Sequence, residues 1–167
     1  RKKELKKRGN DQRHKCLKPY ISTCKEMIKD FVVDKKNNYS IDLCNAVHYE
    51  KKELLIPPYT LGVWLGDGSS NSGDITGIDT EIFNNVRKDG FIVNNRKSEK
   101  TKGVLKLIPM LKKLGVTNNK HIPKQYLQSS IEDRIELLKG LMDTDGTIDK
   151  IGRCTFNNCN KVLANNV

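Results

Sequence analysis

Residues 138–146 have the sequence LKGLMDTDG, and they repeat the pattern of an earlier stretch, residues 61–68, whose sequence is LGVWLGDG. Each stretch is an apolar run with a glycine inside it, and each ends in an Asp-Gly pair. The aspartates of the two pairs, Asp67 and Asp145, are 78 residues apart in the chain. Self-similarity at a fixed spacing indicates that one structural unit occurs twice.

The two repeated stretches are predicted to form helices that pack against one another. We expect one helix over residues 59–65 and another over residues 131–142, because each apolar run stops at an Asp-Gly pair. Gly62 and Gly140 lie inside these helices, where a glycine costs about 1 kcal/mol relative to alanine. Small residues on a contact face let two helix axes approach closely, which offsets that cost. This packing is expected to bring the two helix ends, and their aspartates, together.

Two carboxylates at paired helix C-termini form an unfavourable arrangement unless a cation lies between them. The carboxylates repel one another, and each also faces the negative end of its helix dipole. Mg²⁺ prefers hard oxygen ligands. The predicted magnesium ligands are the side chains of Asp67 and Asp145 with the backbone carbonyls of Gly66 and Thr144. In a basic protein, a magnesium ion on carboxylates indicates phosphodiester chemistry. The alternative is that both aspartates only terminate turns before glycine.

The charge of the chain favours a polyanionic partner. The 167 residues include 31 Lys and Arg against 20 Asp and Glu, a net charge of +11. Residues 1–52 carry +8 of this charge, and residues 53–167 carry +3. Basic side chains placed on phosphates release condensed counterions, so a nucleic acid is the expected partner. A solvated positive face without a partner is the alternative.

Hydropathy and cysteine content bear on the location of the protein. No apolar run approaches the roughly 18 residues of a membrane span, and the basic residues 1–8 are not followed by an apolar stretch. Neither a membrane span nor a secretory signal is therefore expected. The five cysteines are odd in number and scattered, which predicts reduced thiols in a reducing intracellular compartment. Cys154 and Cys159 have four residues between them and no matching second pair, which argues against a zinc knuckle.

The chain is expected to contain a basic leader over residues 1–55, a first repeat over 56–137 and a partial second repeat over 138–167. The Pro-Pro pair at 57–58 separates the leader from the first repeat, because proline can open a helix but not continue one. The leader is expected to hold a helix within residues 20–31, capped by Ser22 or Thr23, and a strand over 39–44. The other expected elements are strands at 73–78, 91–93 and 104–107, helices at 80–88 and 108–114, a hairpin formed by 147–149 and 153–156, and a helix that begins within 160–167.

These motifs resemble those of a known family. Residues 138–146 differ at three positions from LAGLIDADG, the motif that names a family of homing endonucleases. Residues 58–68 resemble the first such motif in the endonuclease domains that inteins carry. Residues 120–123, KHIP, are similar to the Lys-x-Ile-Pro element between the two motifs of those domains. The resemblance covers residues 57–167 and rests on three motifs in the family's order.

The resemblance implies an α+β protein that cuts DNA. The implied architecture is the LAGLIDADG homing-endonuclease fold, an αββαββα repeat with pseudo-twofold symmetry, whose motif helices form the central interface and whose curved sheets lie in the DNA major groove. By position, Asp67 and Asp145 are implied to be metal-binding catalytic carboxylates, one for each DNA strand, and Lys120 the catalytic lysine. An ammonium group there stabilises charge on a phosphate. Asp143 is expected to order its helix end rather than to bind metal. The implied activity is Mg²⁺-dependent, site-specific cleavage of double-stranded DNA.

The chain departs from the family pattern after the second motif. Only 21 residues follow Gly146, whereas 69 residues lie between the two motifs. The second repeat is therefore expected to be truncated, and the chain to be a fragment or to have its sheet edge completed by another chain. By the same resemblance, residues 1–55 correspond to the segment that joins an intein's splicing half to its endonuclease, including the end of that splicing half, so a host protein is an expected partner. The alternatives for the basic leader are a DNA-contacting extension and a solubilising linker. The alternative function is a cleavage-inactive module that only binds nucleic acid or persists as a remnant.

Overall fold

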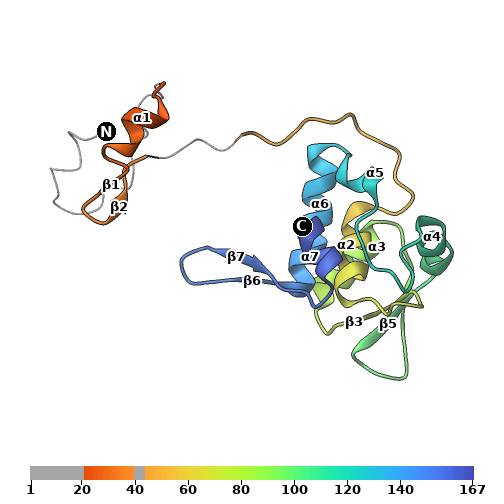
Figure 1. Cartoon of the computed structure of the whole chain (residues 1–167). Helices are drawn as coiled ribbons and strands as arrows, with labels where there is room; N and C mark the ends of the chain where they lie inside the picture. The colour runs from red at the N-terminus through yellow and green to blue at the C-terminus, as the bar shows by residue number, and fades with distance from the viewer. Residues whose placement is uncertain (1–20, 40–43) are drawn as a thin grey trace. The chain divides into compact units, whose positions relative to one another are not determined.

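The chain, seen here in a computed structural model that describes residues 21–39 and 44–167, divides into two units, residues 1–45 and 46–167 (Figure 1). The described part of the first unit holds helix α1 (Cys24–Ile28) and an antiparallel hairpin of β1 (Val32–Val33) and β2 (Lys36–Asn37). Thr23 and Glu26 form a capping box at the start of α1, which confirms a helix in this region. The strand expected over residues 39–44 falls mainly on residues 40–43, outside the described part of the chain.

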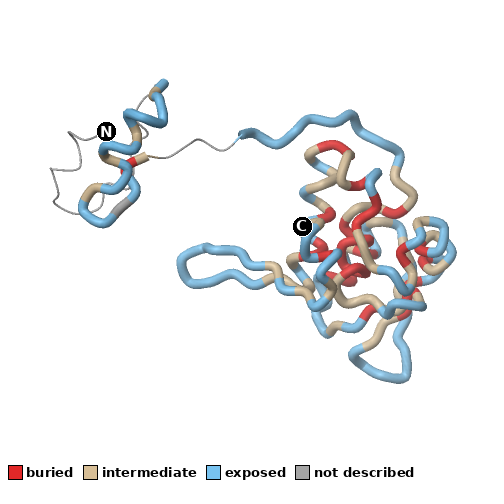
Figure 2. Tube along the Cα trace, in the orientation of Figure 1, coloured by how far each residue is buried: buried red, intermediate tan, exposed pale blue. Residues whose placement is uncertain are grey.

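Helix α2 (Pro58–Asp67) is the centre of the second unit. Pro58 is its first residue, a position where the missing N–H of proline is not needed. Every residue from 59 to 65 is buried, so this helix has no solvent-facing side over most of its length. Figure 2 shows the buried residues gathered around this helix, whereas residues 44–53, farther back in the chain, are exposed. The prediction of an apolar helix before the Asp-Gly pair is confirmed, but the helix continues two residues beyond the predicted end at residue 65, to Asp67.

Helix α6 (Ile131–Asp145) packs directly on α2. Its N-cap residue Ser130 accepts a hydrogen bond from the backbone N–H of Asp133. A Cβ atom added to Gly62 would lie 2.3 Å from the carbonyl oxygen of Leu137 and 3.1 Å from the Cα atom of Gly140. A Cβ atom added to Gly140 would lie 2.3 Å from the carbonyl oxygen of Tyr59. The two glycines therefore permit direct contact between the helix backbones, as expected from the sequence.

Helix α6 ends three residues later than the sequence suggested. The predicted helix stopped at Met142, but the helix continues to Asp145. Asp145 thus occupies the same place in α6 that Asp67 occupies in α2, the last residue of the helix. This equivalence strengthens the internal repeat.

A three-stranded antiparallel sheet lies beside the two central helices, with the order β3 (Asp74–Thr76), β5 (Thr101–Val104), β4 (Val93–Asn95). Helix α3 (Thr80–Lys88) begins after its N-cap Asp79 and buries Ile82, Phe83 and Val86. Helix α4 (Leu107–Leu114) ends at Gly115, whose φ of 71° is the left-handed conformation that glycine adopts easily. The structure is thus a mixed α+β protein with small antiparallel sheets, as the fold class predicted.

The strand expected at residues 104–107 is displaced. The observed strand β5 ends at Val104, and Leu107 is already the first residue of α4. Lys106 adopts a φ of 64°, which breaks the extended chain between the two elements. The alternating apolar and polar residues 104–107 therefore span the end of β5 and the start of α4, and they do not form one strand.

The second repeat follows α6 with a hairpin of β6 (Gly146–Ile148) and β7 (Cys154–Phe156), and then with α7 (Lys161–Asn166). The hairpin turn includes Gly152 with a φ of 83°, as expected for a glycine turn. Figure 2 shows most of this hairpin exposed, in agreement with the exposure of residues 147–155. The hairpin and the helix were both expected from the sequence. The short helix α5 (Lys124–Leu127) was not.

Residues 46–56 are attached to the second unit by side chains from its helices. The hydroxyl of Tyr126 donates to the carbonyl of Ile56 at 2.8 Å and accepts from the backbone N–H of the same residue at 3.0 Å. Arg134 donates to the carbonyl of Val47 and lies over the ring of Tyr49, 5.5 Å from its centroid. The end of the segment that the sequence assigned to the leader, residues 46–55, therefore belongs to the second unit. Among the described residues, no helix is long and apolar enough to cross a membrane.

The substitution Gly62→Ala should lower the free energy of unfolding by about 1–3 kcal/mol, because its Cβ atom would force the backbones of α2 and α6 apart. In a helix with free space around it, the same substitution would stabilise by up to about 1 kcal/mol. Urea denaturation followed by circular dichroism measures the change. Lys139→Ala, at an exposed position next to Gly140, is the control and should change stability by less than about 0.5 kcal/mol. A Gly62→Ala variant as stable as the wild type would contradict the close packing.

Candidate active site

The three predicted catalytic residues lie around the C-terminal ends of α2 and α6. Asp67 and Asp145 are the last residues of these helices, and Lys120 lies in the loop between α4 and α5. A Cβ atom added to Gly66 would lie 3.4 Å from the Oδ2 atom of Asp145, so that carboxylate lies against the end of α2. The charges of both aspartates act on Lys120. The structure therefore brings together residues that are far apart in the sequence.

Lys120 caps the end of helix α2. Its Nζ atom donates to the carbonyl oxygen of Gly66 at 3.0 Å and to that of Gly68 at 2.6 Å. The same ammonium group lies 5.1 Å from the centroid of the Trp64 ring, within the range of a cation–π interaction. The Trp64 ring is itself held by a hydrogen bond from its Nε1 atom to the carbonyl of Ser72 at 2.9 Å. A lysine that sequence alone could not separate from surface lysines is thus fixed at the helix end.

The electrostatics of the site follow from partial burial of like charges. Burial raises the pKa of Asp67 above its ordinary value, and the negative charge of Asp145 raises it further, while Lys120 opposes the shift. Burial lowers the pKa of Lys120, and the two aspartates oppose that shift. Each helix also directs its negative dipole end toward these carboxylates. The site therefore favours the arrival of additional positive charge.

Asp145 has a partner that the sequence analysis did not identify. The Nδ2 atom of Asn158 donates to the Oδ2 atom of Asp145 at 2.6 Å, and the backbone N–H of Asn157 donates to the Asp145 carbonyl at 3.1 Å. Asn160 donates from its side chain to the carbonyl of Lys120 at 2.7 Å. The only available signal was the asparagine-rich sequence of residues 157–160, NNCN, which is typical of turns in general.

The predicted magnesium ligands are suited to that ion in chemistry. Mg²⁺ in proteins is usually held by one or two carboxylates and keeps several waters or phosphate oxygens. Asp67 and Asp145 supply two carboxylates, whereas the carbonyl of Gly66, the third predicted ligand, accepts a hydrogen bond from Lys120 at 3.0 Å. No group of three or more His, Cys, Asp or Glu that could hold a metal occurs in residues 21–39 and 44–167, so the protein's charged ligands there are these two carboxylates.

Thr144 has a packing contact and helix hydrogen bonds of its own. Its hydroxyl lies within hydrogen-bond distance of the carbonyls of Gly140 and Leu141, at 3.1 and 2.9 Å. Its Oγ1 atom also lies 2.0 Å from where a Cβ atom of Gly66 would be. The absence of a side chain at residue 66 therefore lets Thr144 fill the space between the two helix ends.

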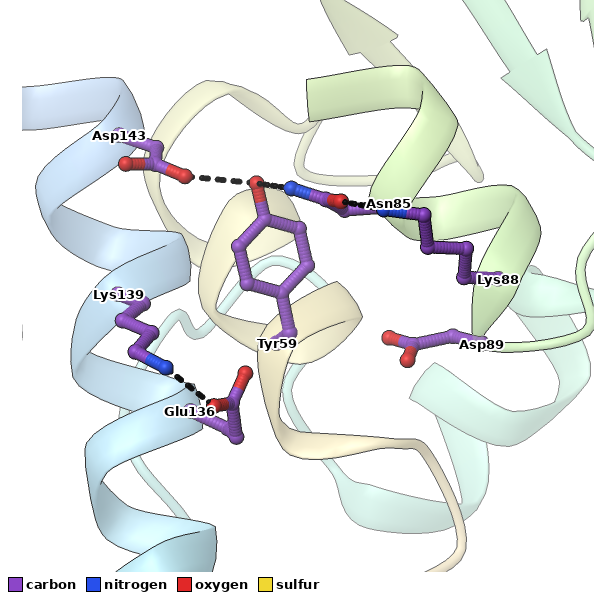
Figure 3. Close-up of a pocket in the computed structure, with 7 residues that line it drawn as sticks. All are labelled: Tyr59, Asn85, Lys88, Asp89, Glu136, Lys139 and Asp143. Atoms are coloured by element: carbon purple, nitrogen blue, oxygen red, sulfur yellow. Dashed lines mark hydrogen bonds and ion pairs between the residues drawn. The ribbon is translucent and has the colours of Figure 1, made fainter. Parts of the chain in front are cut away.

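A polar pocket of about 330 Å³ lies along α2, α3 and α6 and is lined by Tyr59, Asn85, Lys88, Asp89, Glu136, Lys139 and Asp143 (Figure 3). The Tyr59 hydroxyl donates to Asp143 Oδ2 at 2.7 Å and accepts from Asn85 Nδ2 at 3.3 Å. Burial is the main cause of the raised pKa of Tyr59, and Asp143 adds to it. None of the three predicted catalytic residues lines this pocket. Its hydrogen bonds tie the last turns of α6 to α2 and α3, which is the ordering role expected for Asp143.

No protein-family model matches the chain. The chain is similar to the "Replicative DNA helicase DnaB" of Mycobacterium intracellulare, with 40% identity over 132 residues. The match covers 79% of this chain but 21% of the helicase. The chain thus spans about a fifth of the length of the curated relative that it matches.

Replacing Asp67 by Asn should stabilise the protein at neutral pH, by about 0.3–1 kcal/mol from the helix dipole alone. The pKa of Asp67 is raised in the folded state, so its ionisation destabilises the fold at any pH above that raised value. The penalty disappears as the pH falls below the ordinary value of 3.8, and the advantage of the variant should fade in the same range. Urea denaturation as a function of pH measures both effects.

Asp149→Asn is a control that should change stability in the opposite direction to Asp67→Asn, because the pKa of Asp149 is lowered rather than raised. The hydrogen bonds from Arg153 lower the pKa of Asp149, so its charge stabilises the fold above its ordinary pKa, and that contribution is lost as the pH falls through the lowered value. The variant should therefore be less stable than the wild type at pH 7. Equal pH profiles for the wild type and Asp67→Asn would contradict the electrostatic account of the site.

Tyr59→Phe should lower the free energy of unfolding by about 1 kcal/mol, because it removes one hydroxyl that links α2 to both α3 and α6. Thermal unfolding compares it with Tyr49→Phe, whose hydroxyl has no hydrogen-bond partner in the described part of the chain. If both substitutions have the same effect, the pocket network does not contribute to stability.

Proposed function

We propose that this chain is the endonuclease part of an intein, a site-specific, magnesium-dependent enzyme that cleaves double-stranded DNA, and that its host protein is a helicase of the DnaB type. The observation that carries the proposal is the pair of equivalent helix ends with Lys120 between them. Asp67 and Asp145 end helices that are in backbone contact, and a lysine ammonium group is fixed beside them. Two carboxylates at equivalent helix ends, with a lysine beside them, suit phosphodiester hydrolysis on two strands.

In this proposal, the two aspartates bind the metal ion and Lys120 binds the phosphate. A magnesium ion, when bound, stabilises the negative charge on the phosphate and the leaving oxygen. Asp67 and Asp145 hold that ion. Lys120 has three N–H donors, of which two are engaged by the carbonyls of Gly66 and Gly68, so one remains for a phosphate oxygen. Because Lys120 is held by the backbone, it needs no reorganisation when the substrate arrives.

Charge on the strands supports DNA as the substrate. The connection between β4 and β5 carries exposed Arg96, Lys97 and Lys100, and Lys102 follows within β5. Arg96 is paired with Asp74 at 2.7 Å, which holds its side chain against the sheet. Most phosphate contacts in protein–DNA complexes come from such exposed basic side chains, and strands can enter a groove beside them.

The size of the helicase match supports an element embedded in a host. The matched stretch is only a fifth of the helicase. The repeated feature of this chain is an apolar run that ends in Asp-Gly, and its sequence does not contain the phosphate-binding loop GxxxxGK[ST] of nucleotide-driven motors. In the LAGLIDADG fold proposed here, α2 and α6 are the motif helices, and β7 corresponds to β3 of the first repeat. Strand β3 is paired with β5 in the three-stranded sheet of the first repeat. Its counterpart β7 is paired only with β6 in the described part of the chain.

The test is cleavage of linear DNA that carries the helicase coding sequence with this segment removed, in the presence of Mg²⁺. The wild-type chain should cut near the junction. Asp67→Asn and Asp145→Asn should each reduce the cleavage rate by at least about a hundredfold, since loss of even a supporting partner of a metal ligand costs tenfold or more. Glu136→Gln, which removes a carboxylate from the exposed ion pair with Lys139 on the same helix, is the matched control and should leave the rate unchanged.

Two results would overturn the proposal. Folded protein that neither cuts nor binds this DNA would remove both the activity and the substrate. Specific binding without cleavage would favour the cleavage-inactive nucleic-acid-binding alternative over the enzyme.

A further inference from the structure

The four residues that follow strand β7, residues 157–160, contact both sides of the candidate active site. Asn158 donates to the carboxylate of Asp145 at 2.6 Å, and Asn157 donates from its backbone to the carbonyl of the same residue at 3.1 Å. Asn160 donates to the Lys120 carbonyl at 2.7 Å. One short segment therefore holds the end of α6 and the loop that carries the lysine.

Hydrogen bonds to the side chains of Asn158 and Asn160 hold this segment in place. The side chain of Asn158 accepts from the backbone N–H of Asn160 at 2.8 Å, so its amide cannot rotate freely. Asn160 is the N-cap of α7 and accepts from the backbone N–H groups of Val162 and Leu163. Leu163 is fully buried, which anchors α7 in the core. The amide of Asn158 thus reaches Asp145 from a fixed support rather than from a free loop.

The two aspartates of the site are held differently. The Oδ2 atom of Asp145 accepts the Asn158 hydrogen bond and also lies 3.4 Å from the position of a Gly66 Cβ atom, on the side that faces α2. Asp67 has no side-chain hydrogen bond among residues 21–39 and 44–167, and Lys120 acts on it only through its charge. The first repeat therefore lacks an equivalent of the Asn158 contact in the described structure.

We propose that Asn158 is a positioning residue that orients the carboxylate of Asp145 for a divalent cation shared with Asp67. This inference rests on the proposed function. An amide N–H directed at one carboxylate oxygen fixes the rotation of the group, while the other oxygen and the remaining lone pairs stay available. Hydrogen-bonded partners of metal-ligating carboxylates orient those ligands, and their loss typically weakens metal binding by about 10–100-fold.

The test uses Tb³⁺ as a probe of the cation site, because this ion prefers hard oxygen ligands and its luminescence is sensitised by a nearby tryptophan. Trp64 is the single tryptophan of the chain, and Lys120 lies against its ring beside the two aspartates. Titration of the whole chain with Tb³⁺, followed by displacement with Mg²⁺, gives both dissociation constants without DNA or cleavage. Asn158→Ala should weaken binding of each ion by about tenfold.

Two further variants separate positioning from folding. Asn165→Ala, at an exposed site on α7, is the matched control and should bind Tb³⁺ as the wild type does. Asn158→Asp has nearly the same shape but replaces the donor by a carboxylate next to Asp145. It should lower the melting temperature in the absence of cation, because two carboxylates then repel, and should gain more in melting temperature from Tb³⁺ than the wild type gains.

The outcomes distinguish this inference from the function on which it rests. Wild-type binding that is weakened in Asp67→Asn and Asp145→Asn, but unchanged in Asn158→Ala and Asn158→Asp, would overturn the role of Asn158 and leave the cation site standing. A wild-type chain without a Tb³⁺ signal would overturn the cation site, and the positioning role with it. The expected result is weakened Tb³⁺ binding in an Asn158→Ala variant that stays folded, with a melting temperature lowered only by the loss of its two side-chain hydrogen bonds.

Discussion

The contact between α2 and α6 is the constraint on which the rest of the second unit depends. Gly62 and Gly140 lie opposite each other, and a methyl group on either would come within 2.3 Å of a backbone oxygen of the partner helix. Any larger side chain at these positions would separate the helix axes and, with them, the aspartates at the helix ends. The helical cost of two glycines is therefore offset by a contact that only glycine permits. The same contact continues at Gly66, where the missing side chain gives room to Thr144.

The charges of the candidate site lower the stability of the folded protein. Two carboxylates share the negative ends of two helices, and a partly buried ammonium group balances only part of their charge. Lys120 compensates in three ways, through the carbonyls at the end of α2, the face of Trp64 and the charges of the aspartates. An arrangement that is unfavourable locally and supported from several elements is typical of functional sites rather than of structural turns.

Local signals predicted the elements of the second unit well, and long-range contacts explain where they failed. Helices α3 and α4 begin and end near the predicted residues, because caps such as Asp79 and Gly115 act within one turn. Strand β5 lies three residues before its predicted position, because its pairing with β3 and β4, not its own alternation, sets its register. The asparagine at residue 158 carried no recognisable signal, since its partner lies on a different element.

The sequence by itself determined the repeated Asp-Gly helix ends, most of the individual helices and strands, and the pair of aspartates, because periodicity, glycine and capping residues act over a few positions. It placed Lys120 at the site only through resemblance to a family. Only the tertiary structure decided that Lys120 caps α2, that Thr144 fills the space left by Gly66, and that Asn158 holds Asp145. These contacts join residues from separate elements, and the distances between such residues are set by packing of the whole core rather than by any local pattern.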